Sequence, residues 1–383
     1  MKYNNLGKTN LKISQIGLGC EHLQGKPYET VKNVIDAAAE CGINFMDVFM
    51  SEPQIRSDIG KAISNNREKW VIQGHIGSIW KNGQYLKNYD LDACKFFFND
   101  LLERLNTDYI DIGFLHFVDT QEDFENVFNS EIIKYTEDLK QKGIIKTIGM
   151  SSHNPVIAKK AIKTGFIDVL MFSINPLYDF LPENVVIDDY FDSDVLNKKN
   201  LTKIDNERAE LYAICEKMQV GIVSMKTFAG GMLFNKDLSA FGFAVSPYQC
   251  IEYVLSRPAV KSAMIGCVEP NQVKFAVDYE NACDSEKDFS SIFENMKKYN
   301  AKNFCVYCNH CLPCPQKIDI AQVNKYLDLA FNTENIPETI KEHYKNLEKH
   351  ATDCIKCKQC EERCPFNVKI TEKMENAELT FGY

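Results

Sequence analysis

The sequence lacks the long apolar runs that mark a membrane protein. No stretch of the 383 residues approaches the roughly 20 apolar residues that a transmembrane helix needs. No apolar stretch follows the polar first five residues either, so we expect no secretory signal and a reducing, cytoplasmic location. Positive charge is not in excess, because the net charge is −9, and this argues against nucleic acid as a partner.

A dinucleotide-binding fingerprint is also missing, which bears on the fold class. Strand-like and helix-like patterns alternate over residues 1–282, and apolar residues of helical period occur at 31–39, 91–105 and 131–142. An open, doubly wound sheet is one way to build such a chain. However, residues 17–22 after the first strand read Gly-Leu-Gly-Cys-Glu-His and break the Gly-x-Gly-x-x-Gly pattern at its last glycine. Eight strand–helix units favour an α/β fold of the (β/α)8 TIM-barrel class. Their strands are predicted at residues 16–18, 44–47, 70–73, 109–115, 146–149, 169–173, 221–225 and 262–265.

Cysteine, by contrast, is abundant. The chain has 15 cysteines, and eight of them form two runs near the C-terminus, each of which ends in Cys-Pro. The second run has the spacing of bacterial two-cluster ferredoxins, and the first is one residue shorter in its last gap. Zinc knuckles are the alternative, since Cys-x2-Cys pairs also suit tetrahedral zinc. The two runs comprise Cys305, Cys308, Cys311 and Cys314, and Cys354, Cys357, Cys360 and Cys364.

The ferredoxin pattern favours two [4Fe-4S] clusters over zinc. In that pattern the last cysteine of each run ligates the other cluster. We therefore expect Cys364 to complete the cluster of the first run, and Cys314 to complete the cluster of the second. The predicted domains are a barrel over residues 1–282, a helical linker over 283–302 and a ferredoxin-like iron–sulfur module over 303–383.

Two further segments carry structural expectations. Residues 315–353, between the cysteine runs, have helical period and are expected to pack the module onto the barrel. Residues 174–204 follow the sixth predicted strand and contain a dense acidic patch. A loop of this length is either a lid or partner-binding segment over the site or a plain surface excursion.

Several stretches of the first 282 residues resemble the aldo/keto reductase family, a (β/α)8 barrel. They correspond to the family's N-terminal hairpin, its second strand with the catalytic aspartate, the helix before the fourth strand, the fourth strand with the catalytic histidine, and the fifth strand. With the C-terminal module, the whole chain resembles the aldo/keto reductases of anaerobes that are fused to a ferredoxin domain. The stretches are residues 5–14, 42–47, 102–108, 109–116 and 143–152.

The family's catalytic set is Asp, Tyr, Lys and His, and the resemblance places Asp47 and His116 at two of these positions. Glu52 stands where the family has its Tyr, and His75 where it has its Lys. The usual proton donor is therefore missing. His116, His75 or Tyr85 is the expected replacement, because a carboxylate donates a proton near neutral pH only if its pKa is raised. Glu52 has a simpler explanation as a carboxylate at the start of a helix.

The resemblance also implies a nicotinamide cofactor, NAD or NADP. Its expected contacts are Ser151 and Ser152 at the end of the fifth strand, Lys226 at the pyrophosphate, and Gly230 and Gly231, which would let the backbone approach closely. The family's Gln on the sixth strand and Tyr on the seventh are absent. Residues 265–271, at the end of the eighth strand, contain no Lys or Arg to grip a 2′-phosphate, so a preference for NADP is unsupported and the choice of nucleotide stays open.

The sequence thus predicts an iron–sulfur oxidoreductase that acts on a small organic substrate of the carbonyl or alcohol type. Two clusters exchange electrons singly, and an external carrier such as ferredoxin or flavodoxin is the expected partner. Two alternatives stay open. One is a metal-dependent lyase or isomerase on the barrel face, and the other is a non-catalytic electron-transfer subunit.

Overall fold

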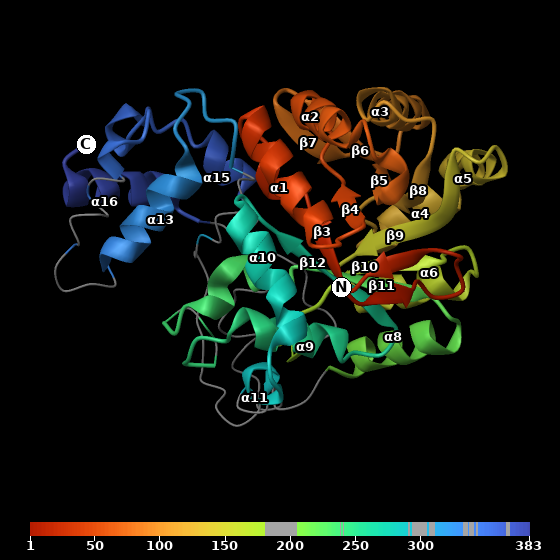
Figure 1. The fold of residues 1–383 in the computed structure, drawn as a ribbon. Helices are drawn as coiled ribbons and strands as arrows, with labels where there is room; N and C mark the ends of the chain where they lie inside the picture. Colours follow the sequence, from red (N-terminus) through yellow and green to blue (C-terminus); the bar gives the residue numbers. More distant parts are fainter. Residues whose placement is uncertain are drawn as a thin grey trace.

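The chain forms a barrel with a smaller module beside it (Figure 1). The computed structural model describes residues 1–180, 205–237, 239, 241–289, 292, 305, 311–331, 336, 341, 344–364 and 368–383. Within these residues, no helix has both the length and the apolar character needed to span a bilayer.

Eight parallel strands close into a barrel, which confirms the predicted fold class and excludes the open sheet. Each strand overlaps the run predicted for it, because the runs are rich in β-branched and aromatic residues. Going round the barrel, the order is β10-β11-β12-β3-β4-β5-β8-β9. The strands are β3 (Ile16–Gly19), β4 (Phe45–Val48), β5 (Val71–Ile76), β8 (Ile110–Leu115), β9 (Ile145–Ser152), β10 (Val169–Ser173), β11 (Gly221–Met225) and β12 (Val260–Gly266).

Helices surround the barrel, and side chains fill its interior. The N-terminal hairpin of β1 (Tyr3–Asn5) and β2 (Lys12–Ser14) contributes Leu6 and Ile13 to the interior cluster, so it plugs the N-terminal end. The C-terminal ends of the strands are left for chemistry, as in other barrels of this kind. The surrounding helices are α1 (Tyr28–Glu40), α2 (Pro53–Ile63), α3 (Leu91–Arg104), α4 (Gln121–Phe128), α5 (Glu131–Gln141), α6 (Pro155–Lys163), α8 (Asn206–Lys217), α9 (Pro247–Leu255) and α10 (Pro270–Asp278).

A second hairpin, which we did not predict, follows β5 directly. It consists of β6 (Ser78–Lys81) and β7 (Gln84–Lys87), joined by Asn82 and Gly83. Asn-Gly between two short strands is the strongest short-range signal for a two-residue hairpin turn. The hairpin carries Tyr85 at the C-terminal end of the barrel.

The described part of the C-terminal module contains three α-helices joined by irregular segments. Helix α13 (Ile320–Phe331) packs against α16 (Ile370–Phe381), and Lys373 Nζ lies 2.6 Å from Asp328 Oδ1. Helix α15 (Gln359–Arg363) contains Cys360 and ends directly before Cys364. Figure 1 shows these helices in blue, beside the barrel. The predicted linker over 283–302 is described only in part, by α11 (Asp284–Lys287), and most of its remainder lies outside the described residues.

One hydrophobic cluster runs from the barrel loops into the module. It joins Leu177 and Phe180 after β10, and Leu233 after β11, to Cys311 and Leu327 of the module. The module is therefore packed on the C-terminal end of the barrel through shared apolar contacts. Burial of such surface stabilises the arrangement by roughly 25 cal/mol per Å².

A buried ionic network closes the barrel wall where the chain leaves β10. Asp179 is fully buried, and it contacts Arg208 Nε at 3.2 Å and accepts hydrogen bonds from the hydroxyls of Tyr212 and Tyr253, at 2.5 and 2.9 Å. The Asp179 carbonyl also accepts the amide of Asp205 at 2.8 Å. The two ends of the segment 181–204 therefore meet at one point. The lid or surface excursion was expected over residues 174–204, and residues 181–204 of that segment lie outside the described residues.

Replacing Asp179 by asparagine is expected to lower the free energy of unfolding by about 3–5 kcal/mol, because the buried guanidinium of Arg208 loses its carboxylate partner. Denaturant unfolding of the holoprotein measures the change. The control is Asp138→Asn, which removes an ion pair between Asp138 and Lys142 whose side chains are 48% and 61% exposed. That variant should change stability by less than about 0.5 kcal/mol, and equal effects of the two substitutions would contradict the prediction.

Candidate active site

Three polar side chains from three neighbouring strands lie in line at the C-terminal end of the barrel. Asp47 lies on β4, His75 on β5, and His116 directly follows β8. His75 Nε2 lies 3.1 Å from Asp47 Oδ1, and His75 Nδ1 lies 2.9 Å from His116 Nδ1. Asp47 and His75 are buried, with 4% and 2% of their surfaces exposed. The structure thus brings together three of the five predicted catalytic residues.

Hydrogen bonding assigns the protons along this line. Asp47 accepts at Oδ1 from the Gln73 amide at 2.7 Å, and its contact with His75 requires His75 Nε2 to donate. A neutral His75 then accepts at Nδ1, so His116 Nδ1 is the donor in the contact between the rings. Nε2 of His116 is left as an acceptor, and it makes no hydrogen bond to any residue that the structure describes. His116 therefore presents a basic nitrogen at the end of a hydrogen-bonded chain.

The surroundings favour the neutral form of His116. Burial lowers its pKa well below the ordinary value of 6.5, and the neighbouring groups His75, Lys87 and His153 lower it further. The causes are loss of hydration of the imidazolium and repulsion by positive charge. At neutral pH the ring is therefore an uncharged base.

Aromatic contacts fix the positions of the two histidine rings. The ring of Phe49 stacks on His116 at 5.9 Å between centroids, and it meets His75 edge-on at 6.0 Å. On its other side it makes an edge contact with Tyr85 at 5.4 Å. The Tyr85 hydroxyl lies 3.5 Å from Glu21 Oε1. The predicted donor Tyr85 therefore lies one ring away from His116, and its catalytic role stays a prediction.

Glu52 has a structural contact of its own. Its carboxylate accepts the Ile55 amide at 2.6 Å and caps the N-terminus of α2, with Pro53 at the first helical position. This is the helix-start position anticipated as its simpler explanation, and a carboxylate there is stabilised by the exposed amides. No contact joins Glu52 to the line of Asp47, His75 and His116 among the described residues.

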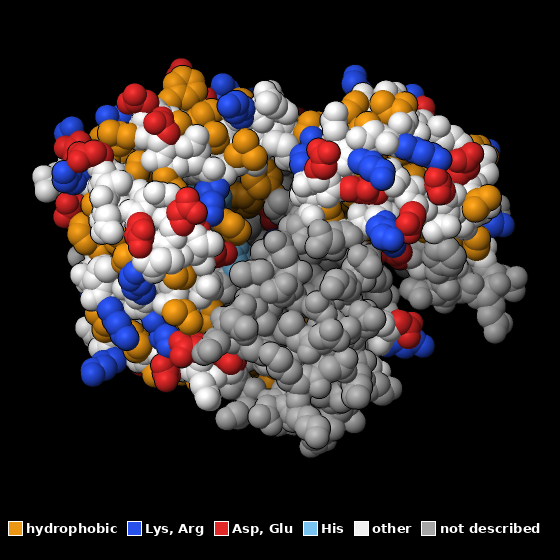
Figure 2. Space-filling view, turned by 180° about the vertical axis from the view of Figure 1, so that it is seen from behind, with side chains coloured by type: hydrophobic (Ala, Val, Ile, Leu, Met, Phe, Trp, Pro, Cys, Tyr) orange, Lys and Arg blue, Asp and Glu red, His pale blue; other side chains and the backbone are white. Residues whose placement is uncertain are grey.

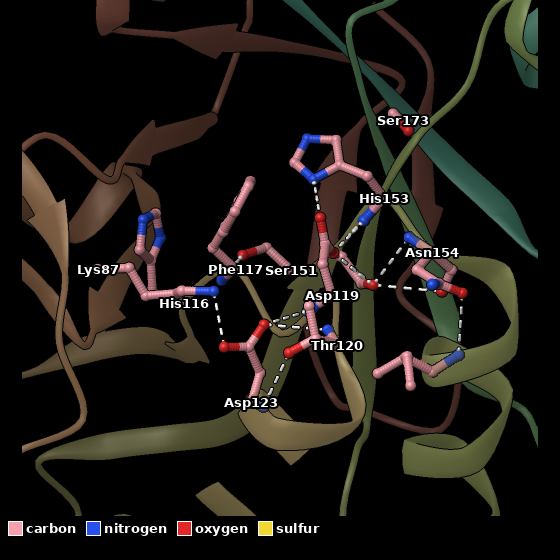
Figure 3. A network of polar contacts seen from close by, with 12 residues as sticks. Lys87, His116, Phe117, Asp119, Thr120, Asp123, Ser151, His153, Asn154 and Ser173 are labelled. Carbon is pink, nitrogen blue, oxygen red and sulfur yellow. Dashed lines mark hydrogen bonds and ion pairs between the residues drawn. The ribbon is translucent and has the colours of Figure 1, made fainter. Parts of the chain in front are cut away.

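A second aspartate–histidine pair, Asp119 and His153, lies in the loops that follow β8 and β9 (Figure 3). His153 Nδ1 lies 2.9 Å from Asp119 Oδ2, and Asp119 Oδ1 accepts the His153 amide and the Ser152 hydroxyl. Burial raises the pKa of Asp119, but the charge and hydrogen bonds of His153 outweigh it and hold that pKa below its usual range. Lys87 is paired nearby with Asp123 at 2.7 Å. The two ion pairs brace the loop that follows His116.

The residues expected to hold a nicotinamide fit it in part. Ser151 and Ser152 are buried at the end of β9, as predicted. Ser151 Oγ accepts the Phe117 amide at 2.8 Å, so its hydroxyl proton is still available for a carboxamide. The Ser152 hydroxyl is already donated to Asp119. One of the two serines therefore keeps a donor for the cofactor.

The residues expected to contact the pyrophosphate suit that group better than the two serines suit the nicotinamide. Lys226 follows β11, half-buried, and its backbone is held by Asn175 Nδ2, which donates to the Lys226 carbonyl at 2.9 Å. Gly230 and Gly231 have φ of 66° and 87° in the next turn, and a Cβ on Gly231 would meet nothing within 4 Å. A left-handed glycine pair with open space beside a lysine suits close approach of a pyrophosphate.

The four cysteines assigned to the second cluster line one cavity of the module. These are Cys314 from the first run and Cys354, Cys357 and Cys360 from the second. This is the grouping that the crossed ligand assignment requires, and the assignment itself stays a prediction. The loop strains its backbone here, since Lys356 and Lys358 have φ of 53° and 61°.

The other ligand set is described only in part, because Cys308 lies outside the described residues. Cys305 and Cys311 are buried, and Cys364 is half-buried. Arg363, beside Cys364, donates to the carbonyls of Cys311 and Pro313 at 2.8 and 2.6 Å, which ties the two runs together. Among the described residues, no three His, Cys, Asp or Glu side chains converge as they would around a single ion. Ligands spread round a cavity suit the four corners of a cluster.

The barrel site opens to the surface. Figure 2 shows a hollow in which histidine side chains are visible next to hydrophobic ones. His116 itself keeps partial exposure, whereas His75 behind it is buried. A small substrate can therefore reach His116 and not His75.

Sequence similarity identifies both parts of the chain. The pattern of the aldo/keto reductase family matches residues 15–243, and that of a 4Fe-4S dicluster domain matches residues 304–369. An uncharacterized oxidoreductase of Bacillus subtilis, YqkF, is 26% identical over 316 residues, which cover 74% of this chain and 92% of that protein. The aldo-keto reductase YhdN of the same organism is 24% identical over 77% of this chain and 94% of its own length.

Solved structures agree on the fold. The holo form of an aldo-keto reductase from Bacillus halodurans superposes with a TM-score of 0.61 at 22% identity. The superposed region comprises 78% of this chain and 98% of the Bacillus halodurans chain. At this level of identity the likeness concerns the fold, so the chemistry has to be derived from this chain's own residues.

Proposed function

Because the chain belongs to the aldo/keto reductase family and carries a 4Fe-4S dicluster domain, we propose that this oxidoreductase interconverts the carbonyl and alcohol forms of a small organic substrate, with His116 as the proton-transfer group. The observation that carries the proposal is the hydrogen-bonded line from Asp47 through His75 to His116. It replaces the family's missing Tyr and Lys by an imidazole that can accept a proton from the substrate and return it.

In alcohol oxidation, Nε2 of His116 accepts the hydroxyl proton of the substrate. The positive charge that develops is shared through His75 with the buried carboxylate of Asp47, which keeps His75 in the tautomer that accepts from His116. In carbonyl reduction the same nitrogen returns the proton to the oxygen. Phe49 holds the ring in place and keeps water from one of its faces.

Two cofactors complete the proposed reaction. A nicotinamide, when bound, exchanges a hydride with the substrate carbon, and each cluster stores one electron. Ser151 would bind the carboxamide, and Lys226 with Gly230 and Gly231 would hold the pyrophosphate. An external one-electron carrier, such as ferredoxin or flavodoxin, would exchange electrons with the module. The solvent-exposed Cys357 lies where such a carrier can approach its cluster.

The alternatives receive less support from the geometry. A metal-dependent lyase needs ligands that converge on one point, whereas His75 uses both ring nitrogens to bond Asp47 and His116. A non-catalytic subunit would not need an open, correctly oriented base. Anaerobic titration tests the proposal: NADH and NADPH are added separately to the holoprotein while cluster absorbance is followed, and alcohols and carbonyls are then screened. Lack of any response to nucleotide or substrate would leave the electron-transfer subunit as the better reading.

The lowered pKa of His116 predicts opposite pH dependences for the two directions. Above its pKa the ring is neutral, so alcohol oxidation should not lose its base as pH falls from 8 to 6.5. Carbonyl reduction needs the protonated ring, so its kcat/KM should fall about tenfold per pH unit over the same range as pH rises. Initial rates in both directions measure this. An oxidation rate that collapses below pH 7 with an apparent pKa near 6.5 would contradict it.

A further inference from the structure

The β6–β7 hairpin connects the barrel site to the cluster module. Trp80 pairs with Tyr85 and Lys81 pairs with Gln84, so Asn82 and Gly83 form the turn. Their φ values are 54° and 75°, as a two-residue turn of type I′ requires. The turn lies at the far end of a hairpin whose first strand begins at Ser78, three residues after His75.

The tip of the hairpin rests on the first cysteine run. Gln84 Nε2 donates a hydrogen bond to the Leu312 carbonyl, and a Cβ placed on Gly83 would lie 2.9 Å from Pro313 Cγ. Leu312 and Pro313 are the two residues between Cys311 and Cys314. Under the crossed assignment, these cysteines ligate different clusters. The hairpin therefore touches the short link between a ligand of one cluster and a ligand of the other.

The base of the hairpin faces the catalytic histidines. Tyr85 lies in edge contact with Phe49, whose ring stacks on His116. Ser78, the first residue of β6, donates its hydroxyl to the Phe49 carbonyl at 2.7 Å and fixes that residue to the hairpin. A continuous series of contacts thus runs from Leu312 through Gln84, Tyr85 and Phe49 to His116.

We propose that the β6–β7 hairpin seats the cluster module on the barrel and that electrons pass between the clusters and the active site along Gln84, Tyr85 and Phe49. The electron route rests on the proposed function, whereas the seating does not. Oxidation of NADH releases two electrons and one proton, and it leaves NAD⁺. Each of the two clusters takes one electron, which balances the step. Tyr85 and Phe49 act here as bridging groups and keep their own electrons.

Seating is tested with a substitution that keeps the turn. Asparagine tolerates positive φ, so Gly83→Asn retains the turn but drives a Cβ into Pro313. Gly143→Asn is the matched control, since Gly143 has φ of 72° and nothing within 4 Å of its Cβ position. Trp80 is one of two tryptophans in the chain, and cluster absorption overlaps tryptophan emission. The clusters should quench Trp80 fluorescence in the wild type. We expect this quenching to be lost in Gly83→Asn, to be retained in Gly143→Asn, and to decrease in Gln84→Ala. Unchanged quenching in both hairpin variants would overturn the seating.

The electron route is tested by the rate at which NADH or NADPH bleaches the clusters of the full chain. Tyr85→Leu removes the bridging ring, so its clusters should bleach about tenfold more slowly than those of the wild type, because a small displacement of reacting groups has large kinetic effects. Phe96→Leu changes an exposed aromatic side chain outside the route and should match the wild type. Bleaching by dithionite should be equal in all variants. Equal nucleotide rates in Tyr85→Leu and Phe96→Leu would overturn the route. Wild-type clusters that neither nucleotide bleaches would count against the route and the proposed function together, and the fluorescence result would still decide the seating.

Discussion

Replacing His116 by asparagine is expected to lower turnover by about 100-fold or more, the usual contribution of a general acid–base group. Asparagine can keep a donor near the position of Nδ1, so the contact with His75 Nδ1 is retained while Nε2 is lost. Substrate turnover under anaerobic conditions measures the effect. Iron content and the cluster spectrum should not change, because no cysteine ligand is touched.

The matched control for this substitution is His22→Asn. His22 is exposed in the short helix Glu21–Leu23 and makes no side-chain hydrogen bond to a described residue. It should retain nearly full turnover. If His116→Asn is also active, and His75→Ala with it, the proton must come from elsewhere, and Tyr85 becomes the first candidate.

The second large effect concerns the clusters. Anaerobically prepared protein should contain about eight iron and eight sulfide per chain, from two clusters of four. Cys360→Ser should reduce this to about four, with loss of the cluster held by Cys354, Cys357, Cys360 and Cys314. Cys364→Ser should leave a similar amount of iron, but here the remaining cluster is the one that Cys360→Ser removes. Iron analysis and electron paramagnetic resonance of the reduced protein distinguish the two.

Double substitutions make the assignment decisive. Cys314→Ser added to Cys360→Ser should cost no further cluster, since both residues line one cavity. Cys364→Ser added to Cys360→Ser should remove both clusters. Cys283→Ser is the control, because that exposed cysteine lies outside both runs. If Cys364→Ser and Cys360→Ser leave the same residual cluster, the crossed assignment is wrong.

The barrel was predictable because its signals are local and repeated. Each of the eight β-rich runs, and each helical stretch between them, predicts its own secondary structure. Eight such strand–helix units predict a closed barrel. The two cysteine runs were equally easy to recognise, because cluster binding imposes fixed spacings on cysteines, and the ligand role of each cysteine stays a prediction. Asp47, His75 and His116 could be placed at strand ends by resemblance, but their contacts depend on the register between strands. His75 pairs with Phe114, two residues before His116, and single-sequence patterns do not encode this.

Other site residues gave weaker signals. The Asn82–Gly83 pair marks the β6–β7 hairpin, and we overlooked it because the hairpin lies outside the repeating strand–helix pattern. Gln73 lies two positions before His75 on the same side of β5, so strand alternation could have placed it against Asp47. Phe49 had no signal, since an aromatic residue after a buried strand is ordinarily core. Its role follows only from the rings that surround it.

The hydrogen bond between Asp179 and Asp205 should allow the intervening residues 181–204 to be replaced by a segment of another length. The barrel itself holds the two junction residues together at 2.8 Å, through a network that uses Arg208, Tyr212 and Tyr253. The entropy of closing a longer or shorter loop between fixed ends changes only slowly with its length. Different segments can therefore be grafted at this junction, beside the end of the barrel that carries the chemistry, without a new folding problem.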